Sequence, residues 1–163
     1  MKMIYITKES EFVKRSDNGL VYYLTKAINT DGELLIVLDA PLISDYSINA
    51  KSITAVCIAY YSDGYDAGIE SNCNISAKNN IYVIGHLMTH KNIKCNGDIT
   101  TTSFIDAATI QAKGKLSCWM IGTYNEGGVV VESVKCGDIA CDGRIKCVEL
   151  EVNGRRVDKE KPL

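Results

Sequence analysis

Aromatic residues other than tyrosine are scarce in this sequence. Of its 163 residues, two are Phe, one is Trp and nine are Tyr. A core centred on large aromatic rings is therefore excluded, and aliphatic side chains, isoleucine above all, must form it. The chain also has only two prolines, so most of its turns depend on the 13 glycines and on Asn and Asp.

An excess of charge of either sign is also missing. With 18 basic and 20 acidic residues, the net charge is −2, which provides no basic field to attract nucleic acid. No apolar run approaches the length of a membrane span, and the short run 3–6 is too brief for a signal peptide. We therefore expect a cytoplasmic protein of one domain. Its seven cysteines are an odd set and are expected to be reduced thiols.

A short unit recurs along most of the chain: a large aliphatic residue, a mostly polar residue, then a small or apolar one. Since residues i and i+2 of a strand share a face, each unit predicts a three-residue strand with two inward side chains and one solvated residue between them. The units begin at residues 48, 53, 75, 81, 93, 99, 105, 110, 116, 134, 139, 145 and 150.

The spacing of these units indicates how the chain is wound. Large positions fall at 93, 99, 105, 110 and 116, so three successive steps add up to 17 residues. This rhythm predicts an all-β, three-sided parallel β-helix (β-solenoid) with right-handed winding. A flat meander of hairpins is the second interpretation, because it needs reversing turns and longer strands. The small second positions fit a narrow tube that large residues alone would overfill.

Residues 1–45 lack the repeat, and we expect them to form a small α/β N-terminal cap. Strands are predicted at 3–6 and 33–39, the latter covered on both faces. A short helix is predicted over 8–14. Residues 20–28 suit either a strand or a helix, and helix is preferred. A separate small domain is the alternative for this segment. The solenoid is expected over 46–153 and a charged tail over 154–163.

The alternation of large and small inward residues over 48–152, at about 17 residues per turn, resembles the bactofilins. These bacterial proteins are triangular right-handed β-helices. The resemblance implies rods that stack head-to-head and tail-to-tail into non-polar filaments without nucleotide. The chain departs from the family in using Ala and Cys at its small positions, and in its long N-terminal segment, which would block growth at that end.

Two sets of side chains are candidate metal ligands: two histidines and three cysteines. His86 and His90 lie four apart, but a strand would hold them about 13 Å from each other, so they are interpreted as surface histidines and only weak metal candidates. Cys136, Cys141 and Cys147 recur too widely for a metal site and are interpreted as core residues on three different inward faces. No cofactor is expected. Turn acids, at 63, 66, 70, 138 and 142, are interpreted as solvated.

Tyrosines and the single tryptophan near two Gly-rich interruptions are the best candidates for binding a partner, because such side chains often anchor interfaces. They are Tyr60, Tyr61, Tyr65, Trp119 and Tyr124.

The leading hypothesis for function is therefore a non-enzymatic scaffold or protein-interaction module, either self-assembling or presenting a face to a protein partner, with no catalytic residue. One alternative is a phage or mobile-element protein that binds and inhibits a host defence complex, as anti-CRISPR proteins do. The other is a small β-helix enzyme acting on carbohydrates or transferring acyl groups.

Overall fold

A computed structural model describes residues 2–61, 64–122 and 130–157, with backbone alone for residues 59–61 and 64–67. The described chain is all-β, contains no helix, and is built mainly of parallel strands. This confirms the all-β prediction. The parallel strands form three stacks, which we call the first, second and third stack.

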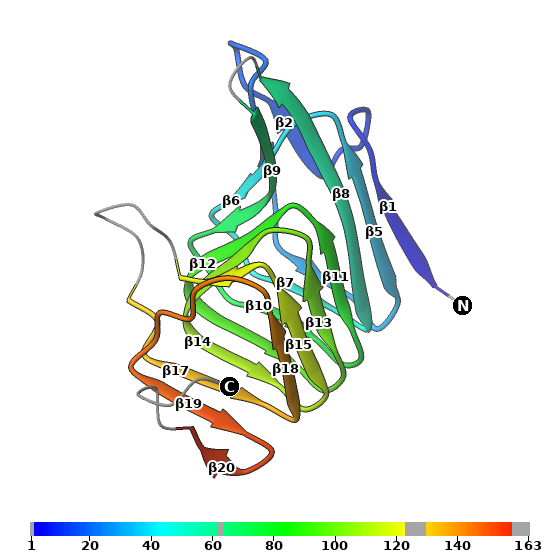
Figure 1. Cartoon of the computed structure of the whole chain (residues 1–163). Coiled ribbons are helices and arrows are strands. Elements are labelled where there is room, and N and C mark those ends of the chain that lie inside the picture. Colours follow the sequence, from blue (N-terminus) through cyan, green and yellow to red (C-terminus); the bar gives the residue numbers. More distant parts are fainter. Residues whose placement is uncertain (1, 62–63, 123–129, 158–163) are drawn as a thin grey trace.

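The first stack is a row of parallel strands seen side by side in Figure 1. Its members are β1 (Met3–Ile6), β5 (Glu33–Leu38), β8 (Ser52–Tyr61), β11 (Ile81–Ile84), β13 (Ile99–Thr101), β15 (Lys115–Cys118) and β18 (Asp138–Cys141).

The second stack uses the first halves of two long strands together with several short ones. Its members are β3 (Tyr22–Leu24), β6 (Leu42–Ser44), β9 (Gly64–Ser71), β12 (His86–Cys95), β14 (Phe104–Ala112) and β16 (Met120–Ile121), with β2 (Val13–Arg15) pairing antiparallel to β3.

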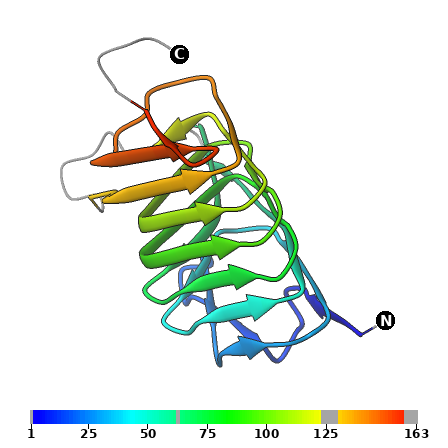
Figure 2. The same cartoon turned by 90° about the horizontal axis from the view of Figure 1, so that it is seen from below.

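The third stack takes the second halves of β12 and β14, and its arrows follow one another in chain order in Figure 2. Its other members are β4 (Ile28–Asn29), β7 (Ile48–Ala50), β10 (Ile75–Ala77), β17 (Ser133–Cys136) and β19 (Glu149–Val152), with β20 (Arg155–Arg156) antiparallel to β19.

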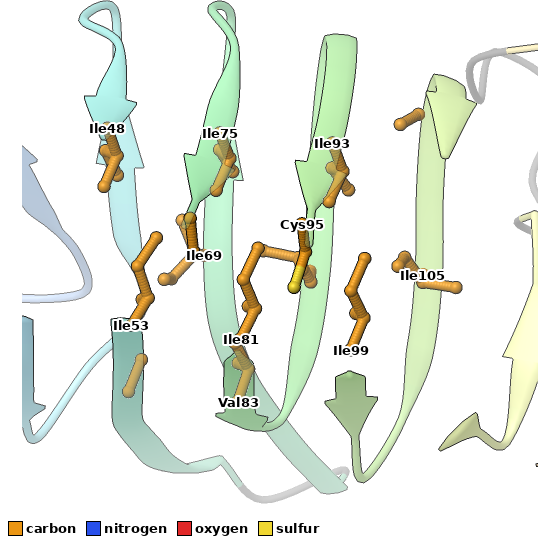
Figure 3. Packing of buried hydrophobic residues seen from close by; sticks show 14 of the residues in the cluster. Ile48, Ile53, Ile69, Ile75, Ile81, Val83, Ile93, Cys95, Ile99 and Ile105 are labelled. Carbon is orange, nitrogen blue, oxygen red and sulfur yellow. The ribbon is translucent and has the colours of Figure 1, made fainter. Parts of the chain in front are cut away.

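The chain visits the stacks in the order first, second, third, and then begins again; we call each such passage a circuit. The strands of one circuit pair in register with those of the next, so that equivalent side chains form rows. In the third stack the row runs through Ile48, Ile75, Ile93 and Ile110, all at most 1% exposed. Figure 3 shows Ile48, Ile75 and Ile93 one after another, and Ile53, Ile81 and Ile99 in a second row. These rows form the hydrophobic core.

The corner between the third and first stacks requires glycine for steric reasons. At Gly97 an added Cβ would overlap the side-chain oxygen of Asn80 and lie 2.9 Å from the carbonyl oxygen of Asn79 in the preceding circuit. The corner of one circuit therefore rests directly on the corner before it, and an amide of Asn80 links them by accepting a hydrogen bond of 2.9 Å from Asp98 N–H.

The expected helices are wrong. Within 8–14 the only turn bonds are single ones, from Ser10 N–H to Thr7 O and from Val13 N–H to Ser10 O, before β2 begins. In 20–28 the chain forms β3 and β4 instead. An isolated helix this short is marginal in water, whereas β3 gains a partner on each side, β2 and β6. The cap of residues 1–45 is consequently not α/β.

The strands of residues 1–45 pair directly with those that follow, since β5 lies between β1 and β8. The strand β5 is covered on one face only, contrary to the expectation, because Val37 is 46% exposed. At the other end, residues 154–157, expected in the tail, form a turn and β20, while 158–163 lie outside the described residues.

Candidate functional site

The tyrosines predicted to bind a partner lie on or near a hairpin that extends beyond the stacks. Strand β8 runs on beyond the first stack, and the end of β8 pairs antiparallel with the start of β9 before β9 enters the second stack, with Tyr60 opposite Tyr65 and Tyr61 opposite Gly64 (Figure 1). The sequence predicted a bulged loop here. The side chains of Tyr60, Tyr61 and Tyr65, and the whole of Tyr124, lie outside the described residues.

Trp119 is 48% exposed at a corner near the last circuit. Its carbonyl oxygen accepts a hydrogen bond of 2.6 Å from Gly143 N–H, and its ring lies over Gly143, where an added Cβ would be 3.6 Å from Trp119 Cε2. The tryptophan is therefore placed by the next circuit, far along the chain from the hairpin tyrosines. Its exposed ring stays a predicted contact for a partner.

The two histidines both lie on β12, but their environments differ. His86 is 4% exposed, so its interpretation as a surface residue is wrong, whereas His90 is exposed. Neighbouring strands lie about 4.8 Å apart, and this spacing stacks the rings of His86 and Phe104, which lie at 4.9 Å with an interplanar angle of 9°. Between Thr89 and Asn92, β12 has a register irregularity as it passes from the second to the third stack.

Glu70 completes a contact that the sequence analysis missed. Its Oε1 lies 3.1 Å from His86 Nε2, and the hydrogen bond from the imidazole holds the pKa of the carboxyl below its usual value. The interpretation of Glu70 as a solvated turn acid is therefore incomplete. Among the described residues no group of three His, Cys, Asp or Glu side chains is arranged to hold a metal ion.

Asp106 departs from the predicted pattern most clearly. It occupies the middle, outward position of a predicted strand unit, yet it is 0% exposed. Its neighbour in register is Met88 on β12. The outward face of the second stack is thus partly covered, whereas the sequence pattern indicates only the direction of a side chain.

The three cysteines of the last circuits lie on different stacks. Cys136 ends β17 in the third stack and Cys141 ends β18 in the first, while Cys147 follows Ile145, whose bridge to Ile121 belongs to the second. Cys136 is 6% exposed and burial raises its pKa to about 11. Cys141 stands in register with Cys118, whose thiol pKa is raised by burial.

The two ends of the stacks differ in how well their inward side chains are covered. At the N-terminal end Ile6, Leu24 and Ile28 are at most 4% exposed, Ile4 is half-buried, and Phe12 and Val13 pack against the core. At the C-terminal end Leu150 is 2% exposed, but five other inward residues are only half-buried: Ile139, Cys141, Ile145, Cys147 and Val152.

A shallow groove of about 580 Å³ lies along the turn between β2 and β3, lined in part by Lys14, Arg15, Leu20 and Tyr23. Arg15 is already engaged: it lies 3.8 Å from Asp39, donates a 3.1 Å hydrogen bond to Gly19 O, and faces the ring of Tyr22. Because the Asp39 carboxylate offsets the charge of Arg15, this guanidinium offers little attraction for an anionic ligand in the groove.

No protein-family model matches the chain, and no curated protein or solved structure shows significant similarity to it. None of the residues that the structure describes forms a helix with the length and apolarity needed to cross a bilayer. Function must therefore be argued from the stacks, their edges and their ends.

Proposed function

We propose that the chain is a three-sided, right-handed parallel β-solenoid that works as a non-enzymatic scaffold or protein-interaction module. The repeated order of the stacks supports this architecture, as does the row from Ile28 to Leu150 in the third stack, where one branched aliphatic residue per circuit lies in register with the next. Right-handed crossovers between parallel strands are strongly preferred.

The observation that carries a role in assembly is the pair of strand edges in the first stack. Within the described chain, β1 pairs only with β5 and β18 pairs only with β15. Each therefore presents backbone N–H and C=O groups on its other side, and such edges readily pair with strands of another molecule. Self-association is the simplest use of two such edges, and it agrees with the resemblance to the bactofilins.

Sedimentation velocity over a range of protein concentrations tests this proposal. We expect the sedimentation coefficient to rise with concentration, and we expect the double variant Tyr5→Lys/Ala140→Lys, which places a charge on each edge strand, to stay monomeric. The matched control is Thr54→Lys/Thr100→Lys, which adds the same charge to inner strands of the same outward row. A monomer at every concentration of the unaltered protein contradicts self-assembly.

The projecting hairpin of β8 and β9 favours a second function, binding to a protein of another kind, such as a host defence complex. It extends away from the stacks, and three tyrosines occupy its strands. The expected result is a stoichiometric complex in a pull-down from bacterial lysate that is lost with Tyr61→Ala. A complex that survives this substitution places the contact elsewhere.

A further inference from the structure

Two cysteines face each other across β15 and β18, which lie side by side in Figure 1. Cys118 ends β15 and Cys141 ends β18, and the two are register partners that both pack into or against the core. Of the strand pairs that the structure describes, this is the one position where cysteine meets cysteine. The others, Cys57, Cys95 and Cys136, have Leu, Ala or Val as register partners. The register of the first stack therefore brings these two sulfurs together.

The separation of the two cysteines suits a disulfide. Register partners on neighbouring strands lie about 4.8 Å apart, within the range of roughly 4.4–6.8 Å between Cα atoms that a disulfide spans. Their Cβ atoms must approach by up to about 1 Å to reach the usual separation of roughly 3.5–4.5 Å. Each cysteine is the last residue of its strand, beside a corner, so this movement disturbs few ladder hydrogen bonds.

The two thiols differ in how accessible they are. Cys118 is 5% exposed, whereas Cys141 is half-buried on a strand beyond which no further strand is described in this stack. The Cys141 thiol donates a hydrogen bond of 3.4 Å to the carbonyl oxygen of Trp119, the residue after Cys118. Burial raises the pKa of the Cys118 thiol, and the neighbouring Cys141 raises it further. A small reagent therefore meets Cys141 first, while Cys118 remains protonated beside it.

We infer that Cys118 and Cys141 form a redox site, at which hydrogen peroxide converts the two thiols into a disulfide that joins the last two circuits. The Cys141 thiolate attacks one peroxide oxygen: the S–O bond forms, the O–O bond breaks, and the hydroxide that leaves takes up a proton. The Cys118 sulfur then attacks the resulting sulfenic acid. The S–S bond forms, the S–O bond breaks, and the hydroxyl leaves as water with the proton of the Cys118 thiol. Two thiols and one peroxide thus give one disulfide and two waters, and two electrons pass from the sulfurs to the peroxide.

Such a disulfide attaches the half-covered end of the stacks to the circuit before it. Strand β18 has a described partner on one side only, and its inward Ile139 is half-buried. The new link also constrains the unfolded chain between residues 118 and 141, so the oxidised protein is expected to unfold at a higher urea concentration. Both thiols belong to one chain, so their oxidation does not depend on the proposed self-association.

Peptide mapping after peroxide treatment tests this site. The folded protein is treated with hydrogen peroxide, its remaining thiols are blocked with iodoacetamide, and it is digested with trypsin without reduction. Cleavage after Lys and Arg yields peptide 116–135, which contains Cys118, and peptide 136–144, which contains Cys136 and Cys141. We expect these two peptides to be linked, with the mass of two hydrogen atoms missing from their sum. Dithiothreitol should separate them.

Two matched variants identify the cysteine that is linked. Cys141→Ala is expected to abolish the link, whereas Cys136→Ala, which removes the other cysteine of the same peptide, is expected to keep it. Alanine suits such inward positions, because Ala55 and Ala112 occupy small positions of the first and third stacks at 0% and 3% exposure. The increase in urea midpoint on oxidation should likewise persist in Cys136→Ala and disappear in Cys141→Ala.

The other outcomes overturn the inference. A link that survives Cys141→Ala and is lost in Cys136→Ala assigns the disulfide to Cys136. A link from Cys141 to Cys147, in peptide 147–155, or covalent dimers on a non-reducing gel without the internal link, also contradict it. So does a protein in which Cys118 stays open to iodoacetamide in urea after the peroxide treatment. None of these results changes the sedimentation expected in reductant, which tests the proposed self-association separately.

Discussion

Deletion of one whole circuit is the most direct test of the proposed solenoid. Deleting residues 99–115 removes 17 residues and joins Asp98 to Leu116. Leu116 then occupies the place of Ile99 beside Ile81, because Ile99 pairs with both of these residues. The same shift brings Ile121 onto Leu87 and Val134 onto Ile93 in the other stacks. Every row is shortened by one residue, and none loses its register.

The cost of this excision should be modest. Folded domains have a free energy of unfolding of about 0.05–0.15 kcal/mol per residue, so 17 residues correspond to about 1–2.5 kcal/mol. The dependence of this free energy on urea concentration should fall by about a tenth, since it scales with the surface exposed on unfolding. Urea unfolding followed by circular dichroism measures both quantities.

A shorter deletion provides the control. Removing residues 99–106 takes away fewer buried residues, but it places Ala107 where Ile99 was and turns Ile110 outward, because a strand alternates its faces with a period of two. We expect this variant to unfold at far lower urea than the 17-residue deletion. If the longer deletion proves the less stable of the two, the argument from register between circuits is wrong.

Three further predictions concern single residues. Gly97→Ala should lower the free energy of unfolding by about 1–3 kcal/mol, as overpacked sites do, because a Cβ would overlap the amide of Asn80, and urea unfolding measures this loss. Glu70 has a lowered pKa in the folded protein, so its ionised form contributes stability above its usual pKa near 4.5, and this contribution is lost as the pH falls through the lower folded pKa. The difference in urea midpoint between the unaltered protein and Glu70→Gln should therefore be largest at neutral pH and shrink on acidification; a difference that is constant from pH 7 to 3 would contradict this. Burial raises the pKa of Cys57 to about 12, so the half-exposed Cys73 should react with iodoacetamide at pH 8 well before Cys57, as peptide mapping would show.

The strand pattern of the chain was readable from the sequence because its signal is local. A unit such as Ile75-Ser76-Ala77 states which side chains point inward, and the structure has Ile75 and Ala77 buried with Ser76 between them more exposed. The all-β class and the isoleucine core follow from many such units. The prediction for residues 20–28 was wrong. Leu20, Leu24 and Ile28 share a helical face and so indicate a helix, but β3 forms here because it pairs with both β2 and β6.

The burial of outward side chains could not be predicted from the sequence. Asp106 and His86 both point away from the core by periodicity, and both are buried. Their burial depends on strands and turns from other circuits, as the ring of Phe104 over His86 illustrates. For the same reason the exposed end was invisible in the sequence: Ile139 and Cys141 repeat the pattern of Leu116 and Cys118, and only the absence of a further described circuit distinguishes them.

The covered N-terminal end has a consequence for synthesis on the ribosome. At about 5–20 residues per second, a circuit of 17 residues takes about 1–3 s to be made, far longer than a strand needs to pair. The covered end is made first and can serve as a template, so each new strand meets a finished edge of its own chain before it meets another molecule. The edge vulnerable to misassembly moves along the growing chain one circuit at a time, and the last edge of the first stack to be made, on β18, has no described partner strand on its outer side.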